Sequence, residues 1–90
     1  MRTPEYSSQF KRDYKKMKSR GKSMAIMKTA MELLLTEKHL PEAYKDHQLK
    51  GEWKFFRELH LESDWLLVYR VAENTVYFTR TGTHSDIFNE

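Results

Sequence analysis

The sequence predicts an α+β fold in which two N-terminal helices pack on a small, mainly antiparallel sheet of four to five strands. Apolar residues recur at helical spacing in the first forty positions, whereas after position 52 they form short runs rich in aromatic and β-branched side chains. The predicted helices precede strands joined by short turns, an order typical of α+β proteins. The 90 residues are expected to form one domain, 1–90, because so short a chain cannot build two cores.

The first helix is predicted over 8–19. Ser7 or Ser8 offers an N-cap, and Gly21 supplies a stop. One helix face carries apolar side chains at i, i+4 and i+7: Phe10, Tyr14 and Met17. The outward positions are basic: Lys11, Arg12, Lys15, Lys16 and Lys18. One face therefore packs while the other presents cations, which could contact a polyanion.

A second helix is predicted after Ser23, which can serve as its cap, and we expect Pro41 to stop its continuation. Its apolar stripe consists of Met24, Met27, Met31, Leu34 and Leu35. Methionines at this spacing indicate core packing and not a metal site. The two helices are expected to form an antiparallel pair, followed by a polar loop over 39–50 that is long enough to carry function.

Three strands are predicted over 53–61, 65–71 and 75–81, separated by polar breaks, and they read as an antiparallel meander. The extended segment around Pro4 and Tyr6 would add a fourth strand. Apolar residues at 53–61 divide between both faces, so the pattern leaves the orientation of that strand open. Residues 82–88 are expected to form a turn or a short helix.

Composition excludes several classes of protein. The chain has no cysteine, which removes disulfides, thiolate metal sites and a thiol nucleophile. No apolar run approaches a membrane span and the first ten residues lack a signal segment, so we expect a soluble, cytoplasmic protein. Positive charge is concentrated at the start: residues 1–30 hold nine basic and two acidic residues, the remainder seven and eleven. This asymmetry favours a polyanionic or acidic partner.

The candidate catalytic residues are His47, His60, Asp64 and His84, all in the loop-and-sheet half. Histidines titrate near neutral pH, so a pair can supply the base that activates a 2′-hydroxyl and the acid that protonates the departing 5′-oxygen of RNA. Each histidine could equally be structural. Histidines with a carboxylate can also bind a metal, but the chain has no HExxH helix and no short His-x-His pair, and the spacing argues against a metal site.

Other side chains could bind RNA beside these four. Lys50, Lys54 and Arg80 are candidate phosphate ligands, although an arginine inside a strand can equally cover a sheet face or form an ion pair. Several strand aromatics could stack on splayed bases, but most are expected in the core. Phe88 is the strongest candidate of these, because it lies beyond the last predicted strand and close to His84.

Four blocks, matching in order and spacing, resemble the pattern of the YafQ branch of the RelE-like toxins. They are Tyr44-Lys45-Asp46-His47-Gln48-Leu49-Lys50-Gly51, Arg57-Glu58-Leu59-His60, Asp64-Trp65-Leu66-Leu67-Val68-Tyr69 and Arg80-Thr81-Gly82-Thr83-His84-Ser85-Asp86-Ile87-Phe88. The resemblance covers nearly the whole chain, including the segment from Ser8 to Asp13. Two positions depart from the pattern: Phe55, where glycine is common, and Ser63, where proline is usual.

The resemblance implies a microbial RNase-like fold and a ribosome-dependent mRNA endonuclease that works without a metal or other cofactor. It implies that His47, His60, Asp64 and His84 form the active centre, with Trp65 and Phe88 in contact with substrate. The implied partners are the ribosome, mRNA and a DinJ/RelB-like antitoxin of the ribbon-helix-helix type. The toxin would be monomeric when free and part of a hetero-oligomer when inhibited. The alternative is a non-catalytic RNA- or protein-binding module of the same fold.

Overall fold

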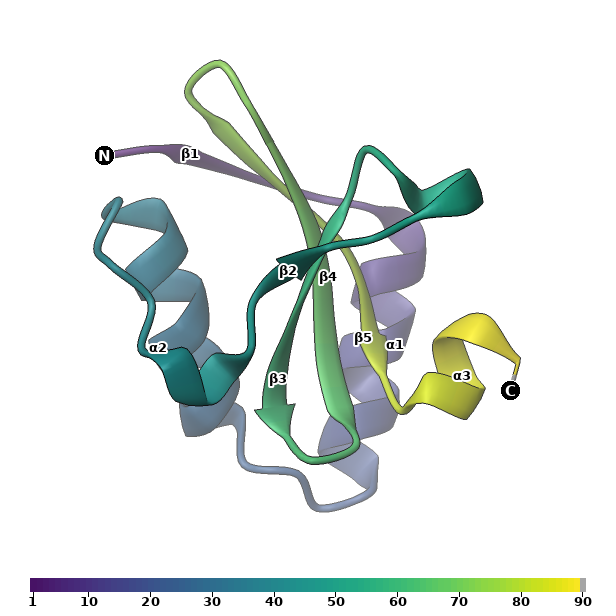
Figure 1. The fold of residues 1–90 in the computed structure, drawn as a ribbon. Coiled ribbons are helices and arrows are strands. Elements are labelled where there is room, and N and C mark those ends of the chain that lie inside the picture. Colours follow the sequence, from purple (N-terminus) through teal and green to yellow (C-terminus); the bar gives the residue numbers. More distant parts are fainter. Residues whose placement is uncertain (90) are drawn as a thin grey trace.

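The three strands of the predicted meander form the centre of a five-stranded sheet with the order β1-β5-β4-β3-β2 (Figure 1). In this computed structural model, which describes residues 1–89, the N-terminal strand lies parallel to β5 and every other neighbouring pair is antiparallel. The strands are β1 (Thr3–Tyr6), β2 (His47–Gln48), β3 (Arg57–Glu62), β4 (Trp65–Ala72) and β5 (Thr75–Gly82). The predicted α+β architecture is confirmed.

Three helices accompany the sheet: α1 (Ser8–Ser19), α2 (Met24–Leu35) and α3 (His84–Phe88). Helix α1 has the predicted bounds because Ser7 caps it, its hydroxyl accepting the Phe10 N–H at 2.8 Å. Both α1 and α2 lie on one side of the sheet, and α3 lies at the opposite face (Figure 1). Within residues 1–89, no helix is long and apolar enough to cross a membrane.

Helix α2 ends at Leu35, well before Pro41, so the predicted stop signal was wrong. Glu37 adopts a left-handed conformation with φ 59°, and the Lys38 N–H donates to the Leu33 carbonyl at 3.0 Å. This is a Schellman closure, which satisfies the last carbonyls of the helix without a glycine. The chain therefore leaves α2 early and reaches the edge of the sheet at β2.

The side-chain pattern of β3 is resolved by the core. Leu59 and Leu61 pack with the residues of α1 and α2, so Glu58 and His60 face the other side of the sheet, hereafter the open face. The helix-side core also contains Phe10, Met17, Met27, Ala30, Leu34, Leu35, Trp65, Leu67, Tyr69, Val76 and Phe78. On the open face a smaller cluster of Leu66, Val68 and Ile87 supports α3.

The predicted strand over 53–61 begins only at Arg57. Gly51 takes a positive φ of 65° and starts a single-turn 3₁₀ helix that ends at Trp53. Trp53 packs edge-on against Phe56 and Phe88, each with ring centroids 5.4 Å apart, so these aromatics support α3 instead of extending the strand. Phe55 is 70% exposed and does not belong to the core.

A buried carboxylate ties α1 to the end of β5. Strand β1 accompanies β5 only as far as Phe78, and beyond this point Asp13 of α1 takes the place of a strand partner. Its Oδ2 accepts the backbone N–H of Thr81 at 3.1 Å and the Arg80 Nε at 2.7 Å. The Asp13 side chain is 6% exposed, so α1 is fixed to the strand that leads into α3.

Helix α3 is held by its own capping box and by α1. The Thr83 hydroxyl accepts the Asp86 N–H, and the Asp86 carboxylate accepts the Thr83 N–H. The same carboxylate accepts a hydrogen bond from Arg20 at 2.7 Å, and this bond holds the pKa of Asp86 well below its usual range. A Cβ on Gly82 would lie 2.9 Å from the Asp86 Cβ, so glycine permits this close approach.

Candidate active site

Three of the four predicted catalytic residues are histidines that meet on the open face. The ring centroids of His47 and His60 are 6.3 Å apart, and those of His60 and His84 are 6.0 Å apart. They come from β2, β3 and the first turn of α3. The strand pairing explains why these histidines meet. His47 on β2 pairs with Glu58 on β3, two residues before His60. Leu66 on β4 pairs with both His60 and Gly82, and Gly82 lies just ahead of α3.

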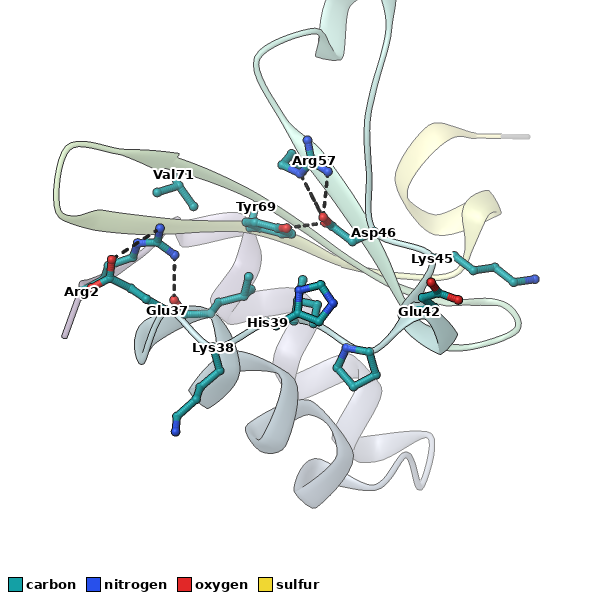
Figure 2. Close-up of a pocket in the computed structure, with 13 residues that line it drawn as sticks. Arg2, Glu37, Lys38, His39, Glu42, Lys45, Asp46, Arg57, Tyr69 and Val71 are labelled. Atoms are coloured by element: carbon teal, nitrogen blue, oxygen red, sulfur yellow. Dashed lines mark hydrogen bonds and ion pairs between the residues drawn. The ribbon is translucent and has the colours of Figure 1, made fainter.

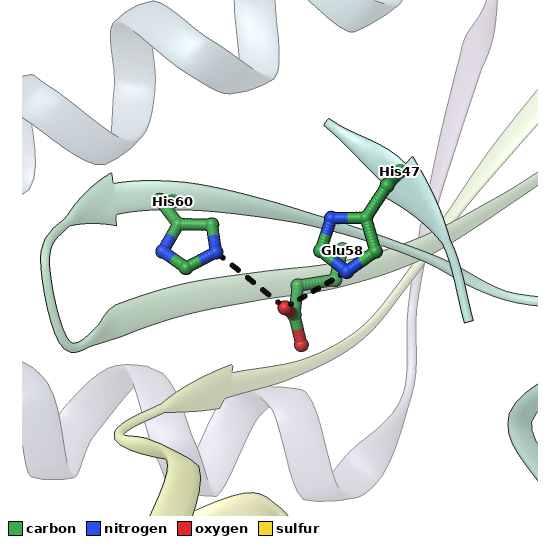
Figure 3. Close-up of side chains that lie close together, drawn as sticks. All are labelled: His47, Glu58 and His60. Atoms are coloured by element: carbon green, nitrogen blue, oxygen red, sulfur yellow. Dashed lines mark ion pairs between the residues drawn. The ribbon is translucent and has the colours of Figure 1, made fainter. Parts of the chain in front are cut away.

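Glu58 lies between two of these histidines (Figure 3). Its Oε2 is 3.3 Å from His47 Nε2 and 3.6 Å from His60 Nε2, and its side chain is 5% exposed. Glu58 was not among the predicted site residues, but the two residues of a Glu-x-His pair on one strand lie on the same face. One carboxylate oxygen thus lies close to both Nε2 atoms, so the three groups can exchange a proton as one unit.

The orientation of His47 is fixed from behind by a backbone carbonyl. His47 Nδ1 lies 2.8 Å from the oxygen of Lys45, and because a carbonyl only accepts, Nδ1 must carry a proton. Glu58 is the acceptor beside Nε2. The Lys45 carbonyl thus fixes a proton on Nδ1, and Nε2, beside Glu58, is the ring atom that can exchange a proton with a ligand on the open face.

The fourth predicted residue, Asp64, pairs with His84. Asp64 lies in the turn between β3 and β4, and its Oδ1 accepts the backbone N–H of His84 at 3.0 Å and the ring Nδ1–H at 2.7 Å. These bonds, led by the one from the backbone, lower the pKa of Asp64. An ionised Asp64 fixes the proton on Nδ1, which leaves His84 Nε2 as the atom that can act on a ligand.

This arrangement predicts how Asp64 responds to pH. Because its folded pKa is lowered, Asp64 remains a carboxylate above its unfolded value of about 3.9, and its bonds to His84 are lost only as the pH falls through the still lower folded value. We expect a carboxyl ¹³C NMR titration of Asp64 to have its midpoint below that of a model peptide. An Asp64 midpoint above that of the model peptide would contradict the assignment.

The histidine cluster also has the composition of a metal site, contrary to the inference from sequence spacing. One ligand atom from each of His47, Glu58 and His60 lies within 4.8 Å of the others. Two imidazoles and a carboxylate suit zinc or copper. Motifs defined by short sequence spacing do not detect this group, because its residues come from two paired strands. The atoms that would bind a metal are the same ones that would exchange protons with a substrate.

The candidate phosphate ligands differ in how free they are. The side chains of Lys50 and Lys54 are exposed on the loop ahead of β3, and Lys54 Nζ lies 5.1 Å from the centre of the Phe55 ring. The Arg80 guanidinium is 19% exposed and is bound to Asp13, with a further bond from Nη2 to the Asp86 carbonyl at 3.3 Å. Arg80 is thus positioned rigidly between β5, α1 and α3.

The two aromatic candidates are separated by the sheet. Phe88 is half-buried at the end of α3, with its ring centroid 6.4 Å from that of His84. Trp65 is completely buried in the helix-side core, where its Nε1 donates to the Thr81 hydroxyl at 3.0 Å. The expected substrate contact by Trp65 is therefore corrected: this side chain packs beneath the site and has no surface to offer.

The basic residues of α1 form a separate surface. Lys11, Arg12, Lys15, Lys16 and Lys18 are all exposed, as predicted from the helical pattern. Helix α1 packs on the helix side of the sheet, away from the open face. Lys16 also reaches Asp86 at 3.4 Å. His39, the remaining histidine, is exposed beyond α2 and lines a cavity that the other three histidines do not line (Figure 2).

Comparison with known proteins places this site in a family. The sequence model described as "Bacterial toxin of type II toxin-antitoxin system, YafQ" matches residues 2–89. The Escherichia coli K12 protein named mRNA interferase toxin YafQ is 44% identical over 85 residues, which cover 93% of this chain and 92% of that protein.

Solved structures agree. The E. coli DinJ-YafQ complex superimposes with a TM-score of 0.91 at 43% identity, covering 98% of this chain and 99% of that chain. A metal-bound toxin from Helicobacter pylori has a TM-score of 0.92 at 42% identity, covering 98% and 100%.

Proposed function

The chain belongs to the YafQ family of bacterial toxins of type II toxin–antitoxin systems, and from this membership we propose that it is a ribosome-dependent mRNA endonuclease. The single observation that carries the proposal is the meeting of His47, His60 and His84 on one sheet face, with Asp64 bound to one and Glu58 between the other two. Such a group contains both proton donors and proton acceptors at neutral pH. Its expected product is a cleaved mRNA and its consequence is inhibited translation.

The proposed reaction is an internal transesterification, and each of its proton transfers is assigned to one of these groups. One histidine of the His47–Glu58–His60 unit takes the proton from the 2′-hydroxyl, which then attacks the adjacent phosphorus. His84, in its imidazolium form, gives the proton on Nε2 to the departing 5′-oxygen and becomes neutral, while Asp64 orients the ring through Nδ1 and does not itself take the proton. Lys50, Lys54 and Arg80 stabilise the charge that develops on the phosphoryl oxygens. Phe88 offers a ring for contact with a base next to the scissile bond.

The partners follow from the same proposal. We expect a cytoplasmic toxin whose basic α1 surface, on the side of the sheet away from the histidines, docks on ribosomal RNA. An E. coli relative occurs in a complex with DinJ, and a DinJ/RelB-like antitoxin of the ribbon-helix-helix type would inhibit this chain likewise. The free toxin would be monomeric and the inhibited form a hetero-oligomer.

To test this proposal, the purified protein is incubated with mRNA on programmed ribosomes and, separately, with bare mRNA. A chelator is present in both reactions. We expect 5′-end mapping to show cuts on ribosomes at an undiminished rate, because proton transfer by histidine requires no metal. Loss of cleavage in chelator, restored by Zn²⁺ or another divalent ion, would overturn the metal-independent mechanism. RNA binding without any cleavage, with or without metal, would instead establish the non-catalytic module.

A further inference from the structure

The contact that orients His47 depends on an unusual backbone turn. Lys45, whose carbonyl accepts the proton of His47 Nδ1, adopts a left-handed conformation with φ 51°. A non-glycine residue in this region is strained and stays there only when its surroundings hold it. Tyr44, on one side of the turn, packs against the helix-side core. Asp46, on the other side, must supply the second restraint.

Asp46 is held by two residues of the central strands (Figure 2). Its Oδ2 accepts hydrogen bonds from Arg57 Nη2 at 2.7 Å and Nε at 3.2 Å, and its Oδ1 accepts one from the Tyr69 hydroxyl. Arg57 is the first residue of β3, and Tyr69 lies opposite it on β4. These three side chains, the Asp46 clamp, join the turn to two strands of the sheet.

The charge states of the clamp are fixed by its surroundings. Burial, followed by the bond to Asp46, raises the pKa of Tyr69 well above its usual value, so the hydroxyl keeps its proton and donates it. The bond to Asp46 raises the pKa of Arg57. Both partners therefore remain donors throughout the neutral range.

Packing alone does not hold the turn on this side. A cavity of about 560 Å³ lies between the segment leaving α2 and the edge of the sheet, and Asp46, Arg57 and Tyr69 are part of its lining. The clamp therefore borders this cavity. The hydrogen bonds from Arg57 and Tyr69 to Asp46 thus hold the 45–46 turn against the two strands.

We propose that Asp46 is a positioning residue for proton transfer by His47: by clamping the turn to β3 and β4, it keeps the Lys45 carbonyl on Nδ1 and leaves Nε2 as the proton-exchanging atom. The inference rests on the proposed nuclease function for its consequence in catalysis. The expected orientation and tautomer of the His47 ring do not depend on that function. Asp46 itself does not touch the open face.

The first test reads the ring directly. Long-range ¹H–¹⁵N NMR spectra distinguish a protonated from an unprotonated imidazole nitrogen. In the wild-type protein, the neutral His47 ring should carry its proton on Nδ1, which faces the Lys45 carbonyl. In Asp46→Ala the Lys45 carbonyl is released, so the neutral ring should keep its proton on Nε2 beside Glu58. Glu42→Ala, which removes another acid lining the same cavity, should behave as wild type.

The second test reads catalysis on programmed ribosomes. Asp46→Ala should lower kcat by about tenfold with KM unchanged, because the ring is displaced but the RNA-binding surface is not. Tyr69→Phe removes one bond while preserving the buried ring, so it should give a smaller loss and serve as the variant if Asp46→Ala does not fold. Asp46→Asn, which still accepts from Arg57, should restore part of the rate.

An unchanged protonation pattern of His47 in Asp46→Ala, or equal losses in Glu42→Ala, would overturn the proposal. A wild-type protein whose neutral His47 ring carries its proton on Nε2 would also overturn it. If wild type shows the expected ring state and loses it in Asp46→Ala, but cuts no RNA, the positioning role stands and the nuclease function fails. The two inferences are thereby separated.

Discussion

Replacing His84 by alanine is expected to lower RNA cleavage on programmed ribosomes by about 10²–10⁴-fold, the usual contribution of a general acid or base. The imidazole is the group whose Nε2 faces the open side while Asp64 holds Nδ1. Its side chain is 42% exposed, so its removal leaves no cavity in the core. The midpoint of urea unfolding should therefore remain close to that of wild type.

The matched control is His39→Ala, which removes an exposed histidine that lies outside the candidate site. Its cleavage rate should equal that of wild type, measured by 5′-end mapping over the same time course. A His84→Ala protein that remains folded and cleaves at more than about a tenth of the wild-type rate would contradict the assignment of His84 as general acid.

The largest effect on stability is expected for Asp13→Ala, a loss of about 3 kcal/mol in the free energy of unfolding. The substitution leaves the buried N–H of Thr81 without its acceptor and the largely buried Arg80 without its counter-ion. It also frees α1 from the end of β5. Urea denaturation followed by circular dichroism measures the change.

Two variants calibrate this result. Asp13→Asn keeps an acceptor for one of the donors but removes the charge, so it should lie between wild type and Asp13→Ala. Glu5→Ala removes an exposed acid from β1 and should remain within about 0.5 kcal/mol of wild type. If Asp13→Ala were no less stable than Glu5→Ala, the carboxylate would not be fixing α1 to the strand.

Much of the fold could be predicted because local signals and packing agree. The period of Phe10, Tyr14 and Met17, together with the cap at Ser7, placed α1 at its observed bounds. The prediction failed where tertiary contacts decide. The aromatic segment 53–56 has the composition of a strand, but Trp53 and Phe56 pack around the end of α3. Likewise, Pro41 was a plausible helix stop, but α2 closes earlier through the left-handed Glu37.

The candidate site could be predicted only in its histidines and Asp64, whose chemistry suggests function in any context. Glu58 and Asp46 were not found because their roles depend on strand register: Glu58 lies opposite His47, and Asp46 lies within reach of Arg57. Arg57 and Glu58 are neighbours in sequence, but adjacent strand residues point to opposite faces, so Arg57 binds Asp46 and Glu58 lies with the histidines. The opposite error was made for Trp65. This residue, next to Asp64, was expected to contact substrate, but its side chain lies on the buried side of the sheet.

The order of the elements along the chain also sets when the site exists. Helix α3, which carries His84 and Phe88, follows every strand of the sheet in the sequence. During synthesis the helices and the meander emerge first and can pack together, but the pair between Asp64 and His84 cannot form until α3 has been made. The sheet can therefore fold while the catalytic centre is still incomplete, and the chain acquires its chemistry only when α3 has docked.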